Sequence, residues 1–268
     1  MPMRDDLELI VKQYPEDVQT LRVYAIGDVH VGAEQFDEEA IKKKIEIIKN
    51  DPCAAVALCG DLADYGLKNS ISNVYKQTMN PREQQEYVLE LFAPIADKIS
   101  ACVAGNHESR ITREVGTCPM YDICVLLGIP EVYRENVAIT KYVFGKNSGQ
   151  KYQNVFVGVT SHGSTRAKHR KFSAGFENAD FMVSGHTHQS EYSPRGRIRI
   201  HPEKGVAVQV PFKEIVVDAH LKPGGYSLEK EYEIAPPSEL QYLELSVYRS
   251  PDKMRRRIKV MNYHAIQL

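Results

Sequence analysis

The chain has 268 residues, of which 43% are hydrophobic and 26% are charged, a composition typical of a folded globular protein and not of a disordered chain. Its 34 Lys and Arg residues and 35 Asp and Glu residues give a net charge of −1, which excludes binding through overall positive charge but not through a local basic patch. The apolar runs are far shorter than the roughly 18 residues of a membrane-spanning helix. The acidic N-terminus lacks the pattern of a secretory signal, so we expect a cytoplasmic protein with no membrane partner.

Five short apolar segments predict strands that are buried on both faces. They cover residues 21–26, 54–59, 99–104, 155–160 and 181–184. A helical pattern occupies residues 34–50, and a second helix is predicted to begin at Asn80-Pro81 and to kink or end at Pro94. Strand-helix-strand alternation predicts parallel pairing with right-handed crossovers.

The pattern becomes β-rich after Gln189. Strands are predicted at residues 198–200, 206–210, 214–217, 240–247 and 258–261, separated by proline and glycine. Pro236-Pro237 is a break in this pattern but not a domain boundary. Two sheets packed face to face, with helices outside, account for both halves of the chain. We therefore expect one α/β domain over residues 1–268, with residues 189–268 completing the second sheet.

Polar segments follow all five of the first strands. They are Gly27-Asp28-Val29-His30, Gly60-Asp61-Leu62-Ala63-Asp64, Gly105-Asn106-His107-Glu108, Ser161-His162-Gly163 and Gly185-His186-Thr187-His188. In an extended segment, residues i and i+2 point the same way, so each Asp-x-His or His-x-His pair can face one metal site. The first residue after a strand projects into the crevice at the carboxyl edge of the sheet. One such segment alone is usually an ordinary turn, but five in chain order predict a metal centre.

The candidate ligands combine carboxylate, imidazole and amide oxygen donors. They are Asp28, His30, Asp61, Asn106, His162, His186 and His188. The set contains no thiolate, which favours Mn, Fe or Zn over a soft metal or Ca²⁺. Seven ligands exceed the needs of one tetrahedral zinc and suit two ions that share a bridging carboxylate.

The segments GDVH, GDLAD, GNHE, SHG and GHTH, in this order over residues 27–188, resemble the signature of the calcineurin-like metallophosphoesterase superfamily. The resemblance implies a four-layer α/β-β/α sandwich of two mixed sheets flanked by helices. It also implies a dinuclear centre with two divalent ions, for which Mn is favoured and Fe, Zn or Ni are alternatives.

The same resemblance implies a role for each matching residue. The first metal would be held by Asp28, His30 and His188, and the second by Asn106, His162 and His186. Asp61 would bridge the two ions. His107 would be the acid that assists the leaving oxygen, and Asp64 would orient His107. A metal-bridging hydroxide would then attack the phosphorus of a phosphoester substrate.

The substrate is less well defined. The stretch from Gly105 to Arg110 is close to that of some Ser/Thr protein phosphatases, but Tyr65 occupies the place of the arginine that grips phosphate in those enzymes. A protein phosphatase is therefore disfavoured, and Arg110 is assigned either to the substrate or to a surface ion pair. The later part of the chain looks similar to uncharacterised phage and bacterial metallophosphoesterases, which supply no substrate and leave a phage origin open.

Basic clusters flank the expected site and make nucleic acid a candidate partner. Arg166, Lys168 and Arg170 follow His162, and three further arginines lie within residues 195–199. They could line a path for an anionic polymer or form a solvated surface.

Three hypotheses remain. The first is a phosphatase or phosphodiesterase that acts on exposed phosphoesters. The second is a DNA or RNA nuclease in which the basic flanks follow the backbone. The third is a catalytically silent metal-containing binding or scaffold module, against which the intact ligand set and His107 argue. The oligomeric state is not predicted.

Overall fold

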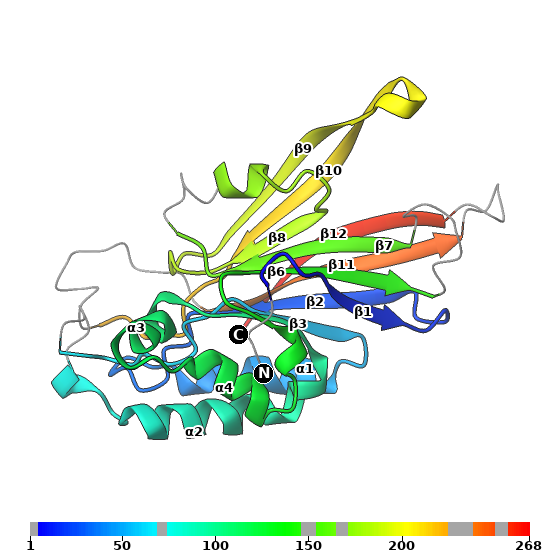
Figure 1. Cartoon of the computed structure of the whole chain (residues 1–268). Coiled ribbons are helices and arrows are strands. Elements are labelled where there is room, and N and C mark those ends of the chain that lie inside the picture. The colour runs from blue at the N-terminus through cyan, green and yellow to red at the C-terminus, as the bar shows by residue number, and fades with distance from the viewer. Residues whose placement is uncertain (1–4, 69–73, 146–153, 165–170, 225–237, 250–256) are drawn as a thin grey trace.

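The computed structural model describes residues 5–68, 74–145, 154–164, 171–224, 238–249 and 257–268. These residues form two six-stranded sheets that pack face to face (Figure 1). In order across the first sheet lie β1 (Ile10–Tyr14), β6 (Val137–Phe144), β7 (Val155–Ser161), β8 (Phe181–Ser184), β10 (Val206–Val216) and β9 (Glu191–His201). The second contains β12 (Arg257–Gln267), β11 (Glu239–Arg249), β2 (Thr20–Ile26), β3 (Ala54–Leu58), β4 (Ile99–Val103) and β5 (Tyr133–Arg134).

Both sheets are mixed. In the second sheet β2, β3, β4 and β5 are parallel, while β11 runs antiparallel to β2 and to β12. In the first sheet β8 is parallel to both β7 and β10, while β6–β7 and β9–β10 are antiparallel. The parallel pairing of the early strands was predicted from their alternation with helices and is confirmed.

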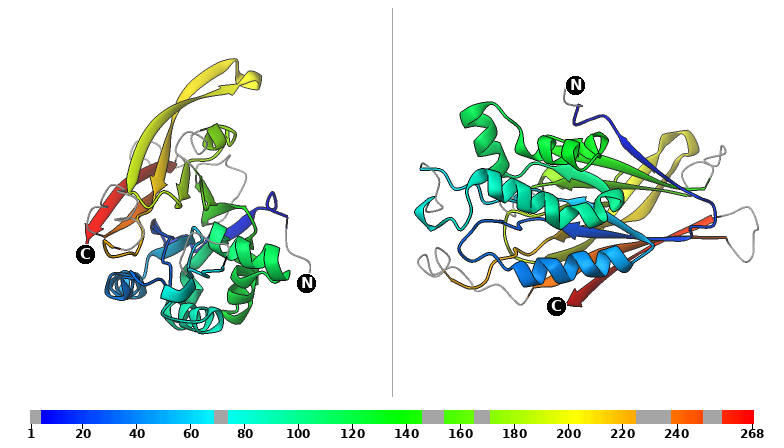
Figure 2. Two further views of the ribbon diagram at one scale, coloured as in Figure 1. Left: turned by 90° about the vertical axis from the view of Figure 1, so that its left-hand side faces the viewer. Right: turned by 90° about the horizontal axis from the view of Figure 1, so that it is seen from below.

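Helices cover the outer face of the second sheet (Figures 1 and 2). α1 (Glu38–Asn50) buries Ile41, Ile45 and Ile48. α2 (Pro81–Phe92) begins with the predicted Asn80 cap and ends before Pro94, where a 3₁₀ turn, η2 (Ala93–Lys98), follows. α4 (Pro119–Leu126) lies on the same side, and α3 (Asn106–Val115) begins at the edge where the strands end. Three further segments are short 3₁₀ turns: η1 (Val74–Lys76), η3 (Pro130–Val132) and η4 (Pro202–Lys204).

The outer face of the first sheet has its own apolar layer. Phe181 and Val183 face the main core between the sheets, whereas Met182 belongs to a separate cluster with Val159 and Phe212. Phe176, just after a helical turn at residues 171–174, packs on this cluster.

Two mixed sheets flanked by helices are the predicted α/β sandwich, which is thereby confirmed. Among the described helices, none has the length and apolar character that crossing a membrane requires.

Some predicted boundaries are wrong. The segments 206–210 and 214–217 form one strand, β10, which continues through Pro211. β8 pairs with β10 only from Lys213 onward, so Pro211 lies in a two-stranded arm where a strand has a free edge and tolerates proline. The first helix begins at Glu38 and not at residue 34, because the Asp37 side chain accepts a hydrogen bond from the Ala40 N–H and caps it.

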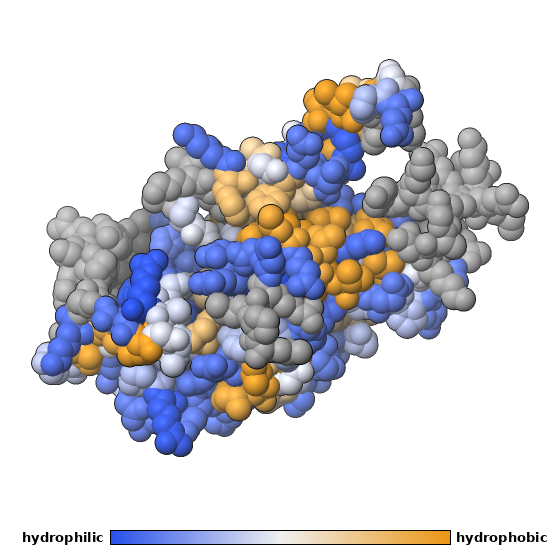
Figure 3. All heavy atoms as spheres, in the orientation of Figure 1, coloured by the Kyte–Doolittle hydropathy of each residue, from blue (hydrophilic) through white to orange (hydrophobic). Residues whose placement is uncertain are grey.

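The β9–β10 arm projects from the body of the molecule (Figures 1 and 2). Near its end Ile198 and Ile200 are 68% and 71% exposed. Figure 3 shows apolar side chains at the outer end of the arm.

Candidate metal centre

The predicted ligands lie where strands of both sheets end. β2, β3 and β4 are parallel, so the loops that follow them share one edge of the second sheet. The first two of these loops run side by side: the N–H groups of Asp28 and Val29 donate to the carbonyls of Gly60 and Asp61 at 3.0 and 2.8 Å. The loop after β8 joins them because the His186 N–H donates to Asp28 Oδ2 at 2.7 Å.

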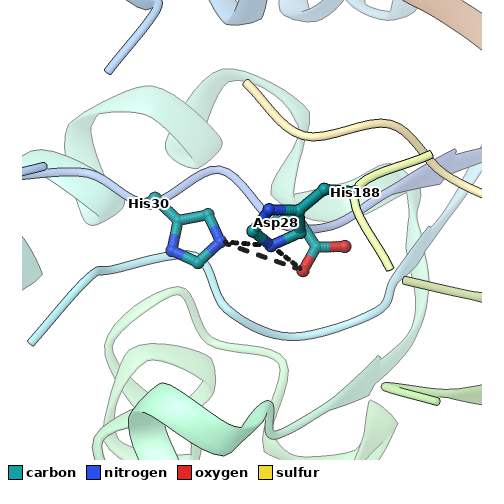
Figure 4. A group of neighbouring side chains, drawn as sticks. All are labelled: Asp28, His30 and His188. Atoms are coloured by element: carbon teal, nitrogen blue, oxygen red, sulfur yellow. Dashed lines mark hydrogen bonds and ion pairs between the residues drawn. The ribbon is translucent and has the colours of Figure 1, made fainter. Parts of the chain in front are cut away.

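Asp28, His30 and His188 form the first group of ligands (Figure 4). The Nε2 atoms of His30 and His188 are 3.1 Å apart, and Asp28 Oδ1 lies 3.9 and 3.5 Å from them. Asp28 Oδ1 is buried and accepts no hydrogen bond from the described residues. A buried carboxylate oxygen without a donor carries a large desolvation penalty that a cation would offset, so these three residues fit a metal ion.

Asn106, His162 and His186 form a second group. Asn106 Oδ1 lies 2.8 Å from His162 Nε2 and 2.9 Å from His186 Nδ1. His162 Nδ1 is 2.8 Å from the Cys59 carbonyl, which can only accept, so Nδ1 carries a proton and Nε2 is the atom that would bind a metal ion. Turning the Asn106 amide over would instead point its nitrogen at these atoms and its oxygen at Arg110 Nη2, 3.1 Å away. A metal ion favours the orientation with the oxygen inward.

Asp61 lies between the two groups. Its Oδ2 is 3.2 Å from His162 Nε2, and Asp28, Asp61 and His162 offer ligand atoms within 4.8 Å of one another. Its Oδ1 accepts the backbone N–H of His107 at 2.8 Å, which fixes the carboxylate plane. This placement fits a bridging role, and the structure brings all seven predicted ligands together.

The backbone at the ligands is unusual. Six non-glycine residues have positive φ in the described part of the chain, and five are predicted ligands: Asp28, His30, Asp61, His186 and His188, with φ from 49° to 75°. The left-handed region costs non-glycine residues of order 1–3 kcal/mol each, and such strain concentrates at functional sites. The sixth residue, Tyr65, follows the second loop and has a φ of 43°.

The Asp28 and Asp61 carboxylates strongly favour positive charge at the site. Burial alone would lower the pKa of His162, but the Asp61 and Asp28 carboxylates outweigh burial and raise it to about 10. Burial would likewise raise the pKa of Asp61, yet His162, His107 and His30 hold it below its usual value. Divalent cations bound here would neutralise the same carboxylates, which supports the fit of the donor set to metal.

His107 lies beside the ligands without belonging to either group. Its Nδ1 is 2.5 Å from the Asp64 carbonyl oxygen, which can only accept, so Nε2 faces the centre, 3.7 Å from Asp61 Oδ2. Burial lowers the pKa of His107 to about 4, against the opposing effect of Asp61.

Asp64 contacts two histidines in different ways. Its carbonyl holds His107, whereas its carboxylate Oδ1 is 3.2 Å from His30 Nδ1 and 3.4 Å from His107 Nδ1. The orienting role expected for Asp64 stays a prediction, and the geometry divides it between backbone and side chain.

The predicted substrate contacts have different positions. Arg110 lies one turn after Asn106 on α3, and its Nη1 is buried with no hydrogen-bond partner in the described chain. Arg166, Lys168 and Arg170 lie outside the described residues. Two arginines of the later cluster make contacts within the protein instead. Arg195 forms an ion pair with Glu214. Arg197 stacks 3.3 Å from the centre of the Phe212 ring and donates hydrogen bonds to the carbonyls of Ser173 and Phe176.

Glu108 is a site residue whose role sequence reasoning missed. It is fully buried, and its carboxylate accepts four backbone N–H groups: Gly105 at 2.8 Å, Asp61 at 2.9 Å, Leu62 at 2.8 Å and Ala63 at 3.3 Å. It thereby joins the Asn106 loop to the Asp61 loop. Burial, reinforced by the Asp61 carboxylate, raises the pKa of Glu108 to about 7. The available signal was its place three residues after the helix cap, the position of a capping box.

We expect Glu108→Gln to lower the free energy of unfolding by about 2–3 kcal/mol, because each carboxylate oxygen accepts two N–H groups and an amide NH₂ would face two of them. Urea unfolding in chelator measures this. Glu90→Gln, on the exposed face of α2, is the matched control. An unfolding free energy within about 0.5 kcal/mol of wild type, the range of ordinary surface substitutions, would contradict the role of Glu108.

The fold and the donor set define a class of protein, the α/β sandwiches in which candidate metal ligands gather where the strands of two sheets end. The family model described as calcineurin-like phosphoesterase matches residues 21–190, and the chain belongs to this family.

Solved structures provide more distant comparisons. The chain is similar to a predicted phosphoesterase from Streptococcus pneumoniae at 10% identity, over 91% of this chain and 98% of that one, with a TM-score of 0.39. It is also similar to Vps29 from Chaetomium thermophilum, at 8% identity over 92% and 97% of the two chains and a TM-score of 0.40. The calcineurin-like phosphoesterase YfkN from Bacillus subtilis has 12% identity over 91% and 90%, with a TM-score of 0.39. No curated protein matched the sequence.

Proposed function

We propose that this protein is a dinuclear metal-dependent phosphoester hydrolase that acts as a phosphatase or phosphodiesterase on exposed phosphoesters. The observation that supports this most is the convergence of seven oxygen and nitrogen donors from both sheets, five of them on left-handed backbone. Such a donor set without thiolate is suited to Mn²⁺, with Fe, Zn or Ni as alternatives.

In this proposal Asp28, His30 and His188 would hold one ion, Asn106, His162 and His186 would hold the other, and Asp61 would be shared by both. When bound, two such ions neutralise phosphoryl oxygens and lower the pKa of water so that it can act as the nucleophile.

The protein's own residues would complete the reaction. His107 presents Nε2 to the centre while the Asp64 carbonyl fixes its orientation, so its imidazolium form, protonated on both nitrogens, is placed to give the Nε2 proton to the departing oxygen. Arg110 brings a guanidinium whose Nη1 has no internal partner in the described chain, and it would bind a phosphoryl oxygen.

Removing metal with a chelator is expected to abolish hydrolysis and to lower Tm by roughly 5–10 °C relative to protein with metal at about 100 times its Kd. Mn²⁺ should restore activity, and Ca²⁺ should not, since imidazole-rich sites disfavour it. Scanning calorimetry measures Tm, and a phosphoesterase assay on the same samples measures hydrolysis. Full activity after exhaustive chelation would refute a metal-dependent enzyme.

A substrate panel with Mn²⁺ separates the alternatives. It contains p-nitrophenyl phosphate, bis-p-nitrophenyl phosphate, cyclic nucleotides, and labelled single- and double-stranded DNA. Turnover of the small esters supports the proposal. Cleavage of DNA alone would favour the nuclease, and silence with two bound metals would favour a binding or scaffold module. In the described part of the chain, Arg195 and Arg197 are engaged internally, which weakens the case for a basic track there.

A further inference from the structure

Two glutamines outside the ligand set contact the loops that follow β2 and β3, two of the three ligand-bearing loops of the second sheet. Gln84 lies on α2 and is 1% exposed, and Gln77 lies in the segment before that helix and is half-buried. Their amides touch each other: Gln84 Nε2 donates to Gln77 Oε1 at 2.9 Å. Neither residue belongs to the metal ligands or to the sequence motifs.

Gln84 lies against the loop after β2 and the loop after β3. Its Oε1 accepts the Tyr65 N–H at 2.8 Å, and its Nε2 also donates to the Met79 carbonyl at 2.9 Å. A Cβ on Gly32, which has a φ of +93°, would lie 2.4 Å from the Gln84 amide carbon. The first loop therefore packs directly on this amide, and Gly32 is needed for the close approach.

Gln77 carries the contact on to the metal centre. Its Nε2 donates to Asp64 Oδ2 at 2.7 Å. The other carboxylate oxygen, Asp64 Oδ1, lies 3.2 Å from His30 Nδ1. A continuous path of side-chain hydrogen bonds thus runs from a backbone N–H to a predicted ligand.

The direction of every hydrogen bond in this path is fixed by its first member. The Tyr65 N–H can only donate, so Gln84 must present its oxygen there and its nitrogen to Gln77. Gln77 then presents its own nitrogen to the Asp64 carboxylate. The carboxylate, held as an acceptor, leaves His30 Nδ1 as the donor, and the lone pair of His30 falls on Nε2. That atom faces Asp28 and His188.

We propose that Gln84 and Gln77 are positioning residues that set the tautomer and orientation of His30 for metal binding. This inference rests on the proposed function only in taking His30 as a ligand. A carboxylate that fixes a histidine ligand is a general device of metal sites, and its loss typically costs 10–100-fold in metal affinity. Here the carboxylate itself accepts a hydrogen bond from the Gln77 amide, and the Gln84 amide orients that of Gln77.

The test substitutes Gln77 with methionine, which is similar in size and makes no hydrogen bond. Gln77→Met should convert His30 from a pure Nδ1–H tautomer to a mixture in ¹⁵N NMR spectra of the metal-free protein, recorded at a pH at which the His30 ring is neutral. It should also weaken Mn²⁺ binding 10–100-fold by titration calorimetry. Gln85→Met is the matched control, because Gln85 directly follows Gln84 on α2. It should change neither the His30 tautomer nor the Mn²⁺ affinity.

Each outcome decides the inference. A wild-type His30 that carries its proton on Nε2, or an unchanged tautomer in Gln77→Met, would overturn it. A fall in the metal-free Tm with an unchanged tautomer would reduce Gln77 to a purely structural role. If Gln77→Glu, which keeps the shape but loses the donor, behaves like wild type, the inference also fails. A wild-type protein with the Nδ1–H tautomer that hydrolyses no ester would refute the proposed function and leave this inference standing.

Discussion

Replacing His107 with alanine is expected to lower kcat by roughly 10²–10⁴-fold on an alkyl phosphate ester, because the departing alkoxide then lacks a proton donor. The loss should be much smaller on p-nitrophenyl phosphate, whose leaving group departs readily without a proton. Steady-state kinetics with both esters at saturating Mn²⁺ measure this difference. Metal content should be unchanged, since His107 belongs to neither ligand group.

The exposed His264, which stacks on Tyr242 away from the site, provides the control as His264→Ala. Equal losses on the two esters would mean that His107 acts on the phosphoryl group and not on the leaving oxygen. Retention of full activity on the alkyl ester would show that the acid is another residue.

Asp61→Asn is expected to cost more metal affinity than the roughly 10–100-fold typical of an outer hydrogen-bond partner, because it removes the charge shared by both ligand groups. The asparagine oxygen can still accept the His107 N–H, so the loop should keep its fold. Its amide nitrogen would then face His162 Nε2 in place of the oxygen found at 3.2 Å. Activity should fall with metal occupancy.

Metal analysis after dialysis against limiting Mn²⁺ and kcat/KM on a diester provide the two readouts. Asp97→Asn, on the exposed turn after α2, is the matched charge change and should alter neither. If Asp61→Asn retains two ions per chain, Asp61 does not bridge the centre.

The convergence of the candidate ligands at the strand ends could be predicted because each buried parallel strand is a continuous apolar run whose end is marked in the sequence. Residues 54–59 illustrate this: the run stops at Gly60, and the first polar residue is Asp61. Parallel pairing then places such ends at one edge. The sequence also carried the capping signals at Asn80 and Pro81, which are local and depend on few neighbours.

Other features depend on contacts that sequence cannot display. β6 mixes Thr140 and Lys141 into its run, and it is a strand because β1 and β7 pair with it on both sides. α3 begins inside a ligand motif, where Glu108 closes its first turn and Gly116 ends it in the left-handed conformation. The use of Gln77, Gln84 and Arg197 is likewise decided by tertiary neighbours.

The left-handed backbone at five predicted ligands also lowers the stability of the fold when no metal is bound. Glycine at His188, where φ is 57°, would relieve local strain and remove a donor in the same step. Heat resistance of the metal-free protein and metal retention therefore select different residues at these positions. A laboratory evolution experiment that rewarded only survival at high temperature in the presence of a chelator would be expected to erase the centre, whereas one carried out with metal and a metal-dependent readout would preserve it.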